Sequence, residues 1–258
     1  MSRAVIVTGA GTGIGAAVAR RLVRDGASVV LVGRRRDPIE RVAAATGQTF
    51  VVADASTEEG VERIVAATVD AHGGIDGLVL NAGVMLPGTV AEASVDDWRA
   101  TLDVNLTGPF LLARAALPQL LERQGSVVSV ASIAALRAGP GMAAYCASKA
   151  GLVLLTQCLA VEQGAAGLRA NVVAPGWVRT EMADEEMDEF GGPRGLDREA
   201  AYAEITRNVP ARRPATADEA AAAVVWLLSP QAAYVNGSVL TVDGGTSIVD
   251  VGTVAFGD

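Results

Sequence analysis

Histidine, lysine, cysteine and the aromatic residues are all scarce in this sequence of 258 residues. The single histidine, His72, excludes zinc sites built on several histidines and allows one histidine-based catalytic triad at most. It precedes two glycines in a loop-like stretch, so we expect a surface side chain and no metal site. The two cysteines, Cys146 and Cys158, share a helical pattern that separates them by about 18 Å along the axis, which excludes a disulfide bond between them.

The sequence also lacks the marks of membrane and nucleic-acid proteins. No apolar run approaches the roughly 18 residues that cross a bilayer, and the longest candidates are Ala150–Val161 and Ala220–Leu228. The apolar stretch Ala4–Val7 is too short for a signal peptide. A net charge of −8 argues against the dense basic face that binds nucleic acid. We therefore expect a cytoplasmic protein that binds neither membrane nor nucleic acid.

Short β-rich runs alternate with longer amphipathic segments along the whole chain. The β-rich runs are Ala4–Val7, Ser28–Val32, Thr49–Val52, Leu78–Leu80, Ser126–Val130, Arg169–Val173 and Val239–Val242. The helical candidates are Gly13–Asp25, Thr57–Ala71, Val95–Val104, Ala143–Glu162 and Ala217–Leu228. Because the β-rich runs are continuously apolar, they indicate strands covered on both faces, as in a parallel sheet. The alternation predicts an α/β fold with a doubly wound sheet, in a single domain over residues 1–258.

One segment, residues 181–213, departs from this alternation. It opens with six carboxylates between Glu181 and Glu189, breaks at Gly191–Pro193 and resumes helical spacing to Thr206. It is either a solvated helical excursion or a lid over a ligand site. We favour a helical substrate lid, because long insertions at the carboxyl edge of a parallel sheet usually border the ligand.

A glycine-rich turn, Thr8–Gly15 (TGAGTGIG), follows the first strand and opens a helix. Backbone N–H groups at a helix N-terminus carry partial positive charge, and glycines let a pyrophosphate approach them. The spacing of Gly9, Gly13 and Gly15 is GxxxGxG, which differs from the general GxGxxG fingerprint. Strand, turn and helix in this order predict a dinucleotide site.

The end of the second strand indicates which dinucleotide binds. An NAD site usually has a carboxylate here for the ribose 2′-hydroxyl, whereas this chain has Gly33 followed by Arg34, Arg35 and Arg36. Guanidinium groups can bind a 2′-phosphate with two parallel hydrogen bonds. The arginines favour NADP(H), with NAD(H) use left open; the alternative is a solvated loop leading to Asp37.

Tyr145 and Lys149 stand at i and i+4 of a helical pattern, hence on one face. Lys149 is the one lysine of the chain, beside twenty arginines, which suggests a place that needs a compact ammonium. Lowering a phenol pKa from about 10 to about 7 takes about 4 kcal/mol of preferential phenolate stabilisation. An adjacent ammonium and the positive ring of a bound nicotinamide could supply it. The YxxxK pattern alone is common on helices.

Several further motifs stand in one order and spacing along residues 4–245. They are TGAGTGIG at Thr8–Gly15, Asp54 after the third strand, Asn81–Gly83, Asn105, Ser132, Tyr145, Lys149, Pro175–Gly176 and Val242–Gly245. With them the chain resembles the short-chain dehydrogenase/reductase family. One departure is Leu80, where the family often has a second asparagine, and residues 246–258 carry no motif. The resemblance implies a Rossmann-like sheet of seven strands in the order 3-2-1-4-5-6-7 and a homotetramer or homodimer.

The resemblance also implies the roles of individual residues. Tyr145 would be the general acid or base, Lys149 would hold the nicotinamide ribose and lower the tyrosine pKa, and Ser132 would hydrogen-bond the reacting oxygen. Asn105 would anchor a water that connects Lys149 to solvent. The implied cofactor-binding residues are Gly9, Thr12, Gly13, Ile14, Gly15, Arg34, Arg35, Asp54, Ala55, Asn81, Ala82, Gly83, Tyr145, Lys149, Pro175, Gly176, Val178 and Thr180. The candidates for the substrate pocket are Val84, Met85, Ile133, Gly139–Met142, Trp177 and Met182.

The sequence therefore predicts an oxidoreductase that transfers a hydride between NADP(H) and a ketone or secondary alcohol. One alternative is a 3-oxoacyl-thioester reductase acting on an acyl carrier, which the acidic segment after Glu181 disfavours because carriers are themselves acidic. Another is a redox-inactive NADP(H)-binding regulator, which the intact set of catalytic residues disfavours. A sugar-nucleotide epimerase would normally need a longer chain.

Overall fold

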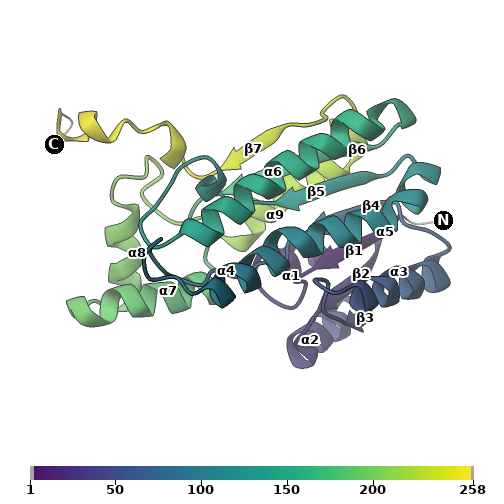
Figure 1. Cartoon of the computed structure of the whole chain (residues 1–258), viewed down its shortest axis with the longest axis horizontal. Helices are drawn as coiled ribbons and strands as arrows, with labels where there is room; N and C mark the ends of the chain where they lie inside the picture. The colour runs from purple at the N-terminus through teal and green to yellow at the C-terminus, as the bar shows by residue number, and fades with distance from the viewer. Residues whose placement is uncertain (1–2, 257–258) are drawn as a thin grey trace.

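The computed structural model describes residues 3–256 and builds these residues around one seven-stranded parallel sheet (Figure 1). The strand order is β3-β2-β1-β4-β5-β6-β7, which confirms the order expected from the resemblance. The strands are β1 (Ala4–Thr8), β2 (Ser28–Gly33), β3 (Thr49–Val52), β4 (Gly77–Leu80), β5 (Ser126–Val130), β6 (Arg169–Pro175) and β7 (Val239–Val242). All seven β-rich runs of the sequence are strands, with bounds shifted by two residues at most.

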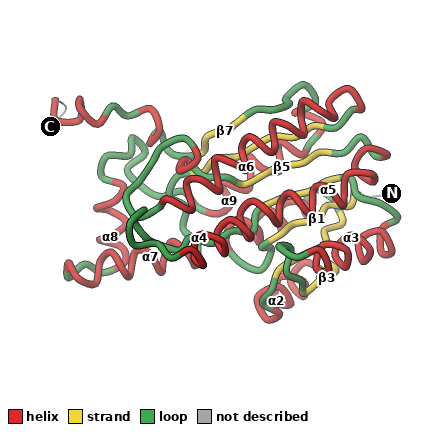
Figure 2. Tube along the Cα trace, in the orientation of Figure 1, coloured by secondary structure: helices red, strands yellow, loops and turns green. Residues whose placement is uncertain are grey.

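Helices cover both faces of this sheet, in three layers (Figure 2). Along β1, Val5 and Val7 pack in the core formed with α1, α2 and α9, whereas Ile6 packs with α3, α5 and α6 on the opposite face. Successive strand side chains point to opposite faces, so a strand covered twice must be apolar at every position. The main helices are α1 (Gly13–Arg24), α2 (Arg36–Thr46), α3 (Glu58–His72), α4 (Val95–Leu102), α5 (Gly108–Glu122), α6 (Ala143–Gln163) and α9 (Ala217–Leu228).

Sequence analysis missed two helices, α2 and α5. Pro38 lies in the first turn of α2, where the missing N–H costs no intrahelical hydrogen bond, so the arginines before it lead directly into a helix. In α5, Pro109 lies at the start and Pro118 inside the helix. Proline is unfavourable inside most helices, so the sequence around these residues gives a weak helix signal.

The prediction that His72 is an exposed loop residue is wrong. His72 is the last residue of α3, and Gly73 with a φ of 71° ends the helix after it. The side chain is half-buried, and its Nε2 is buried without a hydrogen-bond partner among residues 3–256. The first of the two glycines is thus the left-handed cap of the helix.

The search for uninterrupted apolar runs did not single out one helix that is apolar on average over the length of a membrane span. Within residues 3–256, the segment Ala143–Ala166, which contains α6, is long and apolar enough by length and composition to cross a membrane, with a mean hydropathy of 1.4. Polar residues interrupt its sequence, which is why no single run reaches that length. In the fold α6 is a core helix that packs on the sheet through residues such as Leu152 and Leu159. Both cysteines lie on it as free thiols.

The segment after Thr180 forms a pair of helices, α7 (Glu181–Gly191) and α8 (Arg198–Thr206), as its helical spacing indicated. The pair has a small core of its own, in which Met187 and Tyr202 are each 1% exposed. The pair lies outside the sheet, and α7 begins near the carboxyl ends of the strands (Figure 1).

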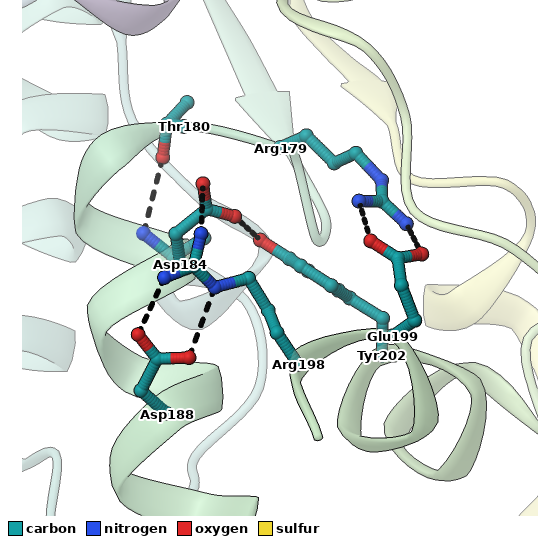
Figure 3. Close-up of polar contacts among 8 residues, drawn as sticks. Arg179, Thr180, Asp184, Asp188, Arg198, Glu199 and Tyr202 are labelled. Carbon is teal, nitrogen blue, oxygen red and sulfur yellow. Dashed lines mark hydrogen bonds and ion pairs between the residues drawn. The ribbon is translucent and has the colours of Figure 1, made fainter.

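Polar contacts brace α7 against α8 (Figure 3). Arg198 on α8 pairs with Asp184 at 3.3 Å and Asp188 at 2.5 Å on α7, and the Tyr202 hydroxyl donates to Asp184 at 2.9 Å. Just before α7, Arg179 pairs with Glu199 and stacks on the Tyr202 ring at 4.5 Å from its centroid. The two helices are therefore held as one unit, which we call the lid.

We expect Arg198→Ala to loosen the lid without unfolding the sheet, since Arg198 is the cation shared by Asp184 and Asp188. Amide hydrogen exchange in α7 and α8 should accelerate several-fold, while exchange in β1 and β4 stays unchanged. Arg207→Ala removes an ion pair with Glu204 at the other end of α8 that does not involve α7, and it is the matched control. Equal protection of α7 in the Arg198 variant and the wild type would contradict a bracing role.

Candidate active site

A cavity of about 780 Å³ opens at the carboxyl edge of the sheet. Its walls come from residues that directly follow strands, among them Gly9 after β1, Asn81 after β4, Ser132 after β5 and Gly176 after β6, and from α7 of the lid. This edge is where open α/β sheets bind their ligands. Every predicted catalytic and cofactor-binding residue except Gly15 and Asn105 lines this cavity.

The glycine turn is shaped for close approach. Gly9 has a φ of 63°, and a Cβ there would lie 2.8 Å from Nδ2 of Asn81. A Cβ on Gly13, where φ is 53°, would lie 3.0 Å from the methyl group of Thr180. Gly15 is tighter still: its Cβ would meet the Gly9 carbonyl oxygen at 2.3 Å, so this glycine lets helix and turn pack and does not line the cavity.

The N-terminus of α1 is left open to a ligand. Thr12 is the residue before the helix, but its side chain makes no capping hydrogen bond. Thr57, Ser94 and Thr180 do cap α3, α4 and α7. The first N–H groups of a helix have no partner within it, so those of α1 face a glycine-lined cavity with their partial positive charge unused. This cradle fits the pyrophosphate of a dinucleotide.

Of the three arginines that follow β2, two line the cavity and one lies outside its lining. Arg34 and Arg35 line the cavity, with side chains more than half exposed. Arg34 lies 4.0 Å from Asp54, and Arg35 pairs with Glu181 at 2.5 Å. Arg36 is outside the cavity lining, and its guanidinium stacks 5.8 Å from the centroid of the Phe50 ring.

Tyr145 and Lys149 lie one turn apart on α6 and both line the cavity. The Lys149 side chain is buried, and its Nζ donates to the carbonyl oxygen of Val130 at 3.0 Å. The same Nζ lies 5.7 Å from the centroid of the Tyr145 ring. The Ser132 side chain lies close enough to the Tyr145 hydroxyl to oppose the rise of its pKa, and the Ser132 Oγ accepts from the backbone N–H of Ala134 at 3.1 Å. Phenol, hydroxyl and ammonium thus converge at one end of the cavity.

Burial dominates the acidity of this group. It raises the pKa of Tyr145 to about 12, against the opposing hydrogen bond from Ser132, and the carboxylate of Glu186 raises it further. Burial also lowers the pKa of Lys149 to about 8. The expectation that Lys149 lowers the tyrosine pKa is therefore not met by the protein alone. Bringing the phenol from about 12 to about 7 needs about 7 kcal/mol of preferential phenolate stabilisation, which the bound cofactor and substrate must help to provide.

Asn105 lies behind the cavity in a π-helical turn, Asp103–Thr107, between α4 and α5. Its Oδ1 accepts from the Val84 N–H at 2.8 Å, and its Nδ2 donates to the Val84 carbonyl at 2.9 Å and to the Ser148 hydroxyl at 3.0 Å. Ser148 in turn donates to the backbone carbonyl of Tyr145 at 2.8 Å. The Asn105 side chain thus ties the loop after β4 to α6. Sequence reasoning missed Ser148, although a serine beside Lys149 on a helix was the available signal.

The substrate end of the cavity is mostly apolar. Val84, Met85, Ile133, Gly139, Met142, Trp177 and Met182 line it as predicted, whereas Pro140 and Gly141 do not. Sequence reasoning did not assign the carboxylates of α7 that also line it, Glu181, Glu185 and Glu186. Burial, together with Glu189, raises the pKa of Glu186 to about 7. The run of six carboxylates was the signal, but only the fold shows which of them face inward.

Comparison with known proteins agrees with this geometry. Residues 9–247 match the family described as "Enoyl-(Acyl carrier protein) reductase". The chain is 43% identical to Protein MoaE of Klebsiella aerogenes, covering 99% of this chain and 100% of that one. It is 35% identical to meso-2,3-butanediol dehydrogenase of Serratia marcescens, covering 96% of each chain.

Two solved structures share the fold throughout. Levodione reductase is 35% identical, with a TM-score of 0.92 over 96% of this chain and 98% of that one. The 3-ketoacyl-(acyl-carrier-protein) reductase from Brucella melitensis, complexed with NADH, is 31% identical, with a TM-score of 0.85 over 95% of this chain and 98% of that one.

We expect Lys149→Met to stabilise the fold while it disables the site. A lysine whose pKa falls from 10.5 to about 8 is destabilising at pH 7 by about 3 kcal/mol at most, part of which the bond to Val130 returns. Chemical denaturation at pH 7 should therefore show a gain of about 1–2 kcal/mol. Lys149→Arg keeps the buried charge and should show no gain.

The gain should also depend on pH in a defined direction. The unfolded lysine binds more protons than the folded one between pH 8 and 10.5, so wild-type stability rises across that interval. The difference between the Met variant and the wild type should shrink accordingly. A Met variant less stable than the wild type at pH 7 would show that the ammonium is a net structural contact.

Proposed function

The chain belongs to the short-chain dehydrogenase/reductase family, and we propose that within it the protein is an NADP(H)-preferring enzyme that interconverts a ketone and a secondary alcohol. Its family makes it an oxidoreductase of alcohol or ketone substrates that uses a nicotinamide dinucleotide. The observation that carries the proposal is the convergence of Tyr145, Ser132 and Lys149 at one end of a cavity whose other end is the open N-terminus of α1.

The protein's own groups move a proton and orient the reactants. Bound cofactor supplies or accepts the hydride. In reduction, Tyr145 donates its proton to the carbonyl oxygen, and in oxidation it removes the alcohol proton. Ser132 holds the reacting oxygen beside the phenol, and Lys149 binds the ribose hydroxyls of the cofactor with an ammonium fixed by Val130. Asn105 keeps the loop after β4 and the catalytic helix in register through Val84 and Ser148.

Arg34 and Arg35 support the preference for NADP(H). Both are exposed at the cavity where the second strand ends, and neither is preceded by the carboxylate that an NAD site places there. A 2′-phosphate would take up hydrogen bonds from both guanidinium groups. The cofactor-binding residues of the glycine turn, together with Asp54, Ala55, Asn81–Gly83, Pro175–Gly176, Val178 and Thr180, would hold the rest of the molecule.

The alternative substrate is an acyl thioester on a carrier protein. The family description and the Brucella melitensis relative favour it, but the carboxylates of α7 at the mouth of the cavity would repel an acidic carrier. A small-molecule ketone avoids that repulsion. We further propose that the chain forms one domain and assembles as a homotetramer or homodimer, which the exposed Phe110 on α5 and Leu154 and Val161 on α6 support.

Tyr145→Phe is expected to abolish turnover and keep cofactor binding. Removing the proton donor should lower kcat by about a thousandfold in an NADPH-oxidation screen over ketones, acyl thioesters and quinones. The Kd for NADPH, measured by fluorescence, should change by less than about twofold, because the ring still packs on α6. A redox-inactive regulator would show no turnover in the wild type and no difference between the two proteins.

Replacing Arg34 and Arg35 together by glutamine is expected to lower kcat/KM for NADPH by about a hundredfold, since each lost charge-assisted hydrogen bond is worth about 1.5–3 kcal/mol at most. The value for NADH should stay within about threefold. Arg36→Gln removes the same charge outside the cavity and serves as the control. Wild-type turnover with NADH but not NADPH would overturn the cofactor assignment.

A further inference from the structure

We propose that Glu181, on the lid, sets the strength of cofactor discrimination by competing with a 2′-phosphate for Arg35. The inference rests on the proposed NADP(H) site and adds to it a residue of opposite charge. It is carried by an ion pair that joins the end of β2 to the start of α7 at the wall of the cavity.

Arg35 and Glu181 are each other's close ionic partner among residues 3–256, while Glu185 acts on Arg35, and Arg41 on Glu181, from a longer distance. Nη2 of Arg35 lies 2.5 Å from Oε2 of Glu181, and this is the one hydrogen bond or ion pair that either side chain makes in that range. Both residues line the cavity, and their side chains are 61% and 49% exposed. A charge-assisted hydrogen bond from a guanidinium to a carboxylate oxygen is the contact that a phosphate oxygen would make with the same group.

The neighbouring arginine has a different relation to its carboxylate. Arg34 lies 4.0 Å from Asp54, but Asp54 is already held by the backbone N–H of Ser56 at 2.9 Å and its hydroxyl at 2.6 Å. Asp54 is therefore positioned by its own turn. Glu181 has no such tie, so its carboxylate is free to leave Arg35 when a stronger anion arrives.

The lid fixes where Glu181 stands. Of the other carboxylates on α7, Asp184 and Asp188 are taken by Arg198 on α8, and Thr180 caps the helix through the Ala183 N–H at 3.2 Å. The backbone of Glu181 is thus set by a braced unit while its side chain reaches Arg35 (Figure 3 shows the brace). The hydrogen bond from Arg35 also lowers the pKa of Glu181, so the carboxylate stays charged at neutral pH.

A 2′-phosphate must therefore displace a resident anion, whereas a 2′-hydroxyl need not. Breaking the pair is therefore expected to affect the two cofactors unequally. Removing the charge of Glu181 should favour the phosphorylated one by freeing Arg35 and by removing a like charge near the phosphate. It should leave the unphosphorylated one unaffected.

The test uses the full chain and two fragments that lack the nicotinamide, adenosine 2′,5′-bisphosphate and ADP, titrated by calorimetry at low salt. Glu181→Gln should tighten the bisphosphate by about five- to twentyfold and leave the Kd for ADP within about twofold. Glu189→Gln makes the same charge change on the same helix, outside the cavity lining, and should alter neither. The kcat/KM ratio of NADPH to NADH should rise in parallel for the Glu181 variant alone.

Repeating the Glu181 substitution in an Arg35→Ala variant decides whether the tighter binding of the bisphosphate depends on Arg35. In Arg35→Ala, the further change Glu181→Gln should give less than about twofold tightening of the bisphosphate. Equal tightening with and without Arg35, equal gains for ADP, or the same gain from Glu189→Gln would each overturn the inference. If the wild type binds the bisphosphate no better than ADP, the proposed preference for NADP(H) is refuted. The comparison of Glu181→Gln with the wild type would still decide whether the Arg35–Glu181 pair affects binding of the bisphosphate.

Discussion

The buried ammonium of Lys149 is the constraint on which the rest of the site depends. It has one hydrogen bond to the protein, to the Val130 carbonyl, and no carboxylate partner among residues 3–256. An unpaired charge out of water is costly, and this cost is visible in the lowered pKa of the side chain. Lys149 also lines the cavity, where the hydroxyl groups of a bound ligand would give its ammonium further hydrogen-bond partners.

The same reasoning explains why Tyr145 is less acidic here than a phenol in water. Burial penalises its anion, and the neighbouring carboxylate of Glu186 adds to the penalty. Holding the proton until the reactants are assembled prevents its loss to solvent. In the proposed mechanism, the acidity needed for catalysis is therefore a property of the complete complex, and the protein contributes alignment through Ser132 and Asn105.

Most of the features that could be predicted from the sequence are encoded in short local patterns of residues. Continuous apolar runs identified all seven strands because a doubly covered sheet demands them. The short spacings of the glycine turn and of Tyr145 and Lys149 were enough to predict that these residues share one cavity. The wrong predictions also came from local patterns. The helices α2 and α5 contain prolines and were not predicted, and the glycine after His72 was interpreted as part of a loop although it caps a helix. The contacts between distant segments, Asn105 with Ser148 and Arg35 with Glu181, could not be predicted, since no spacing in the sequence encodes them.

The presence of a single lysine has a practical consequence for handling the protein. Reagents that acylate or alkylate ε-amines find one side-chain target in the whole chain, and it is the buried one on α6. Conventional coupling of dyes, biotin or resins through surface lysines therefore has no harmless site to use. The exposed thiol of Cys158 is no safer a site, because it shares a face of α6 with Leu154 and Val161, where we propose that a partner subunit packs.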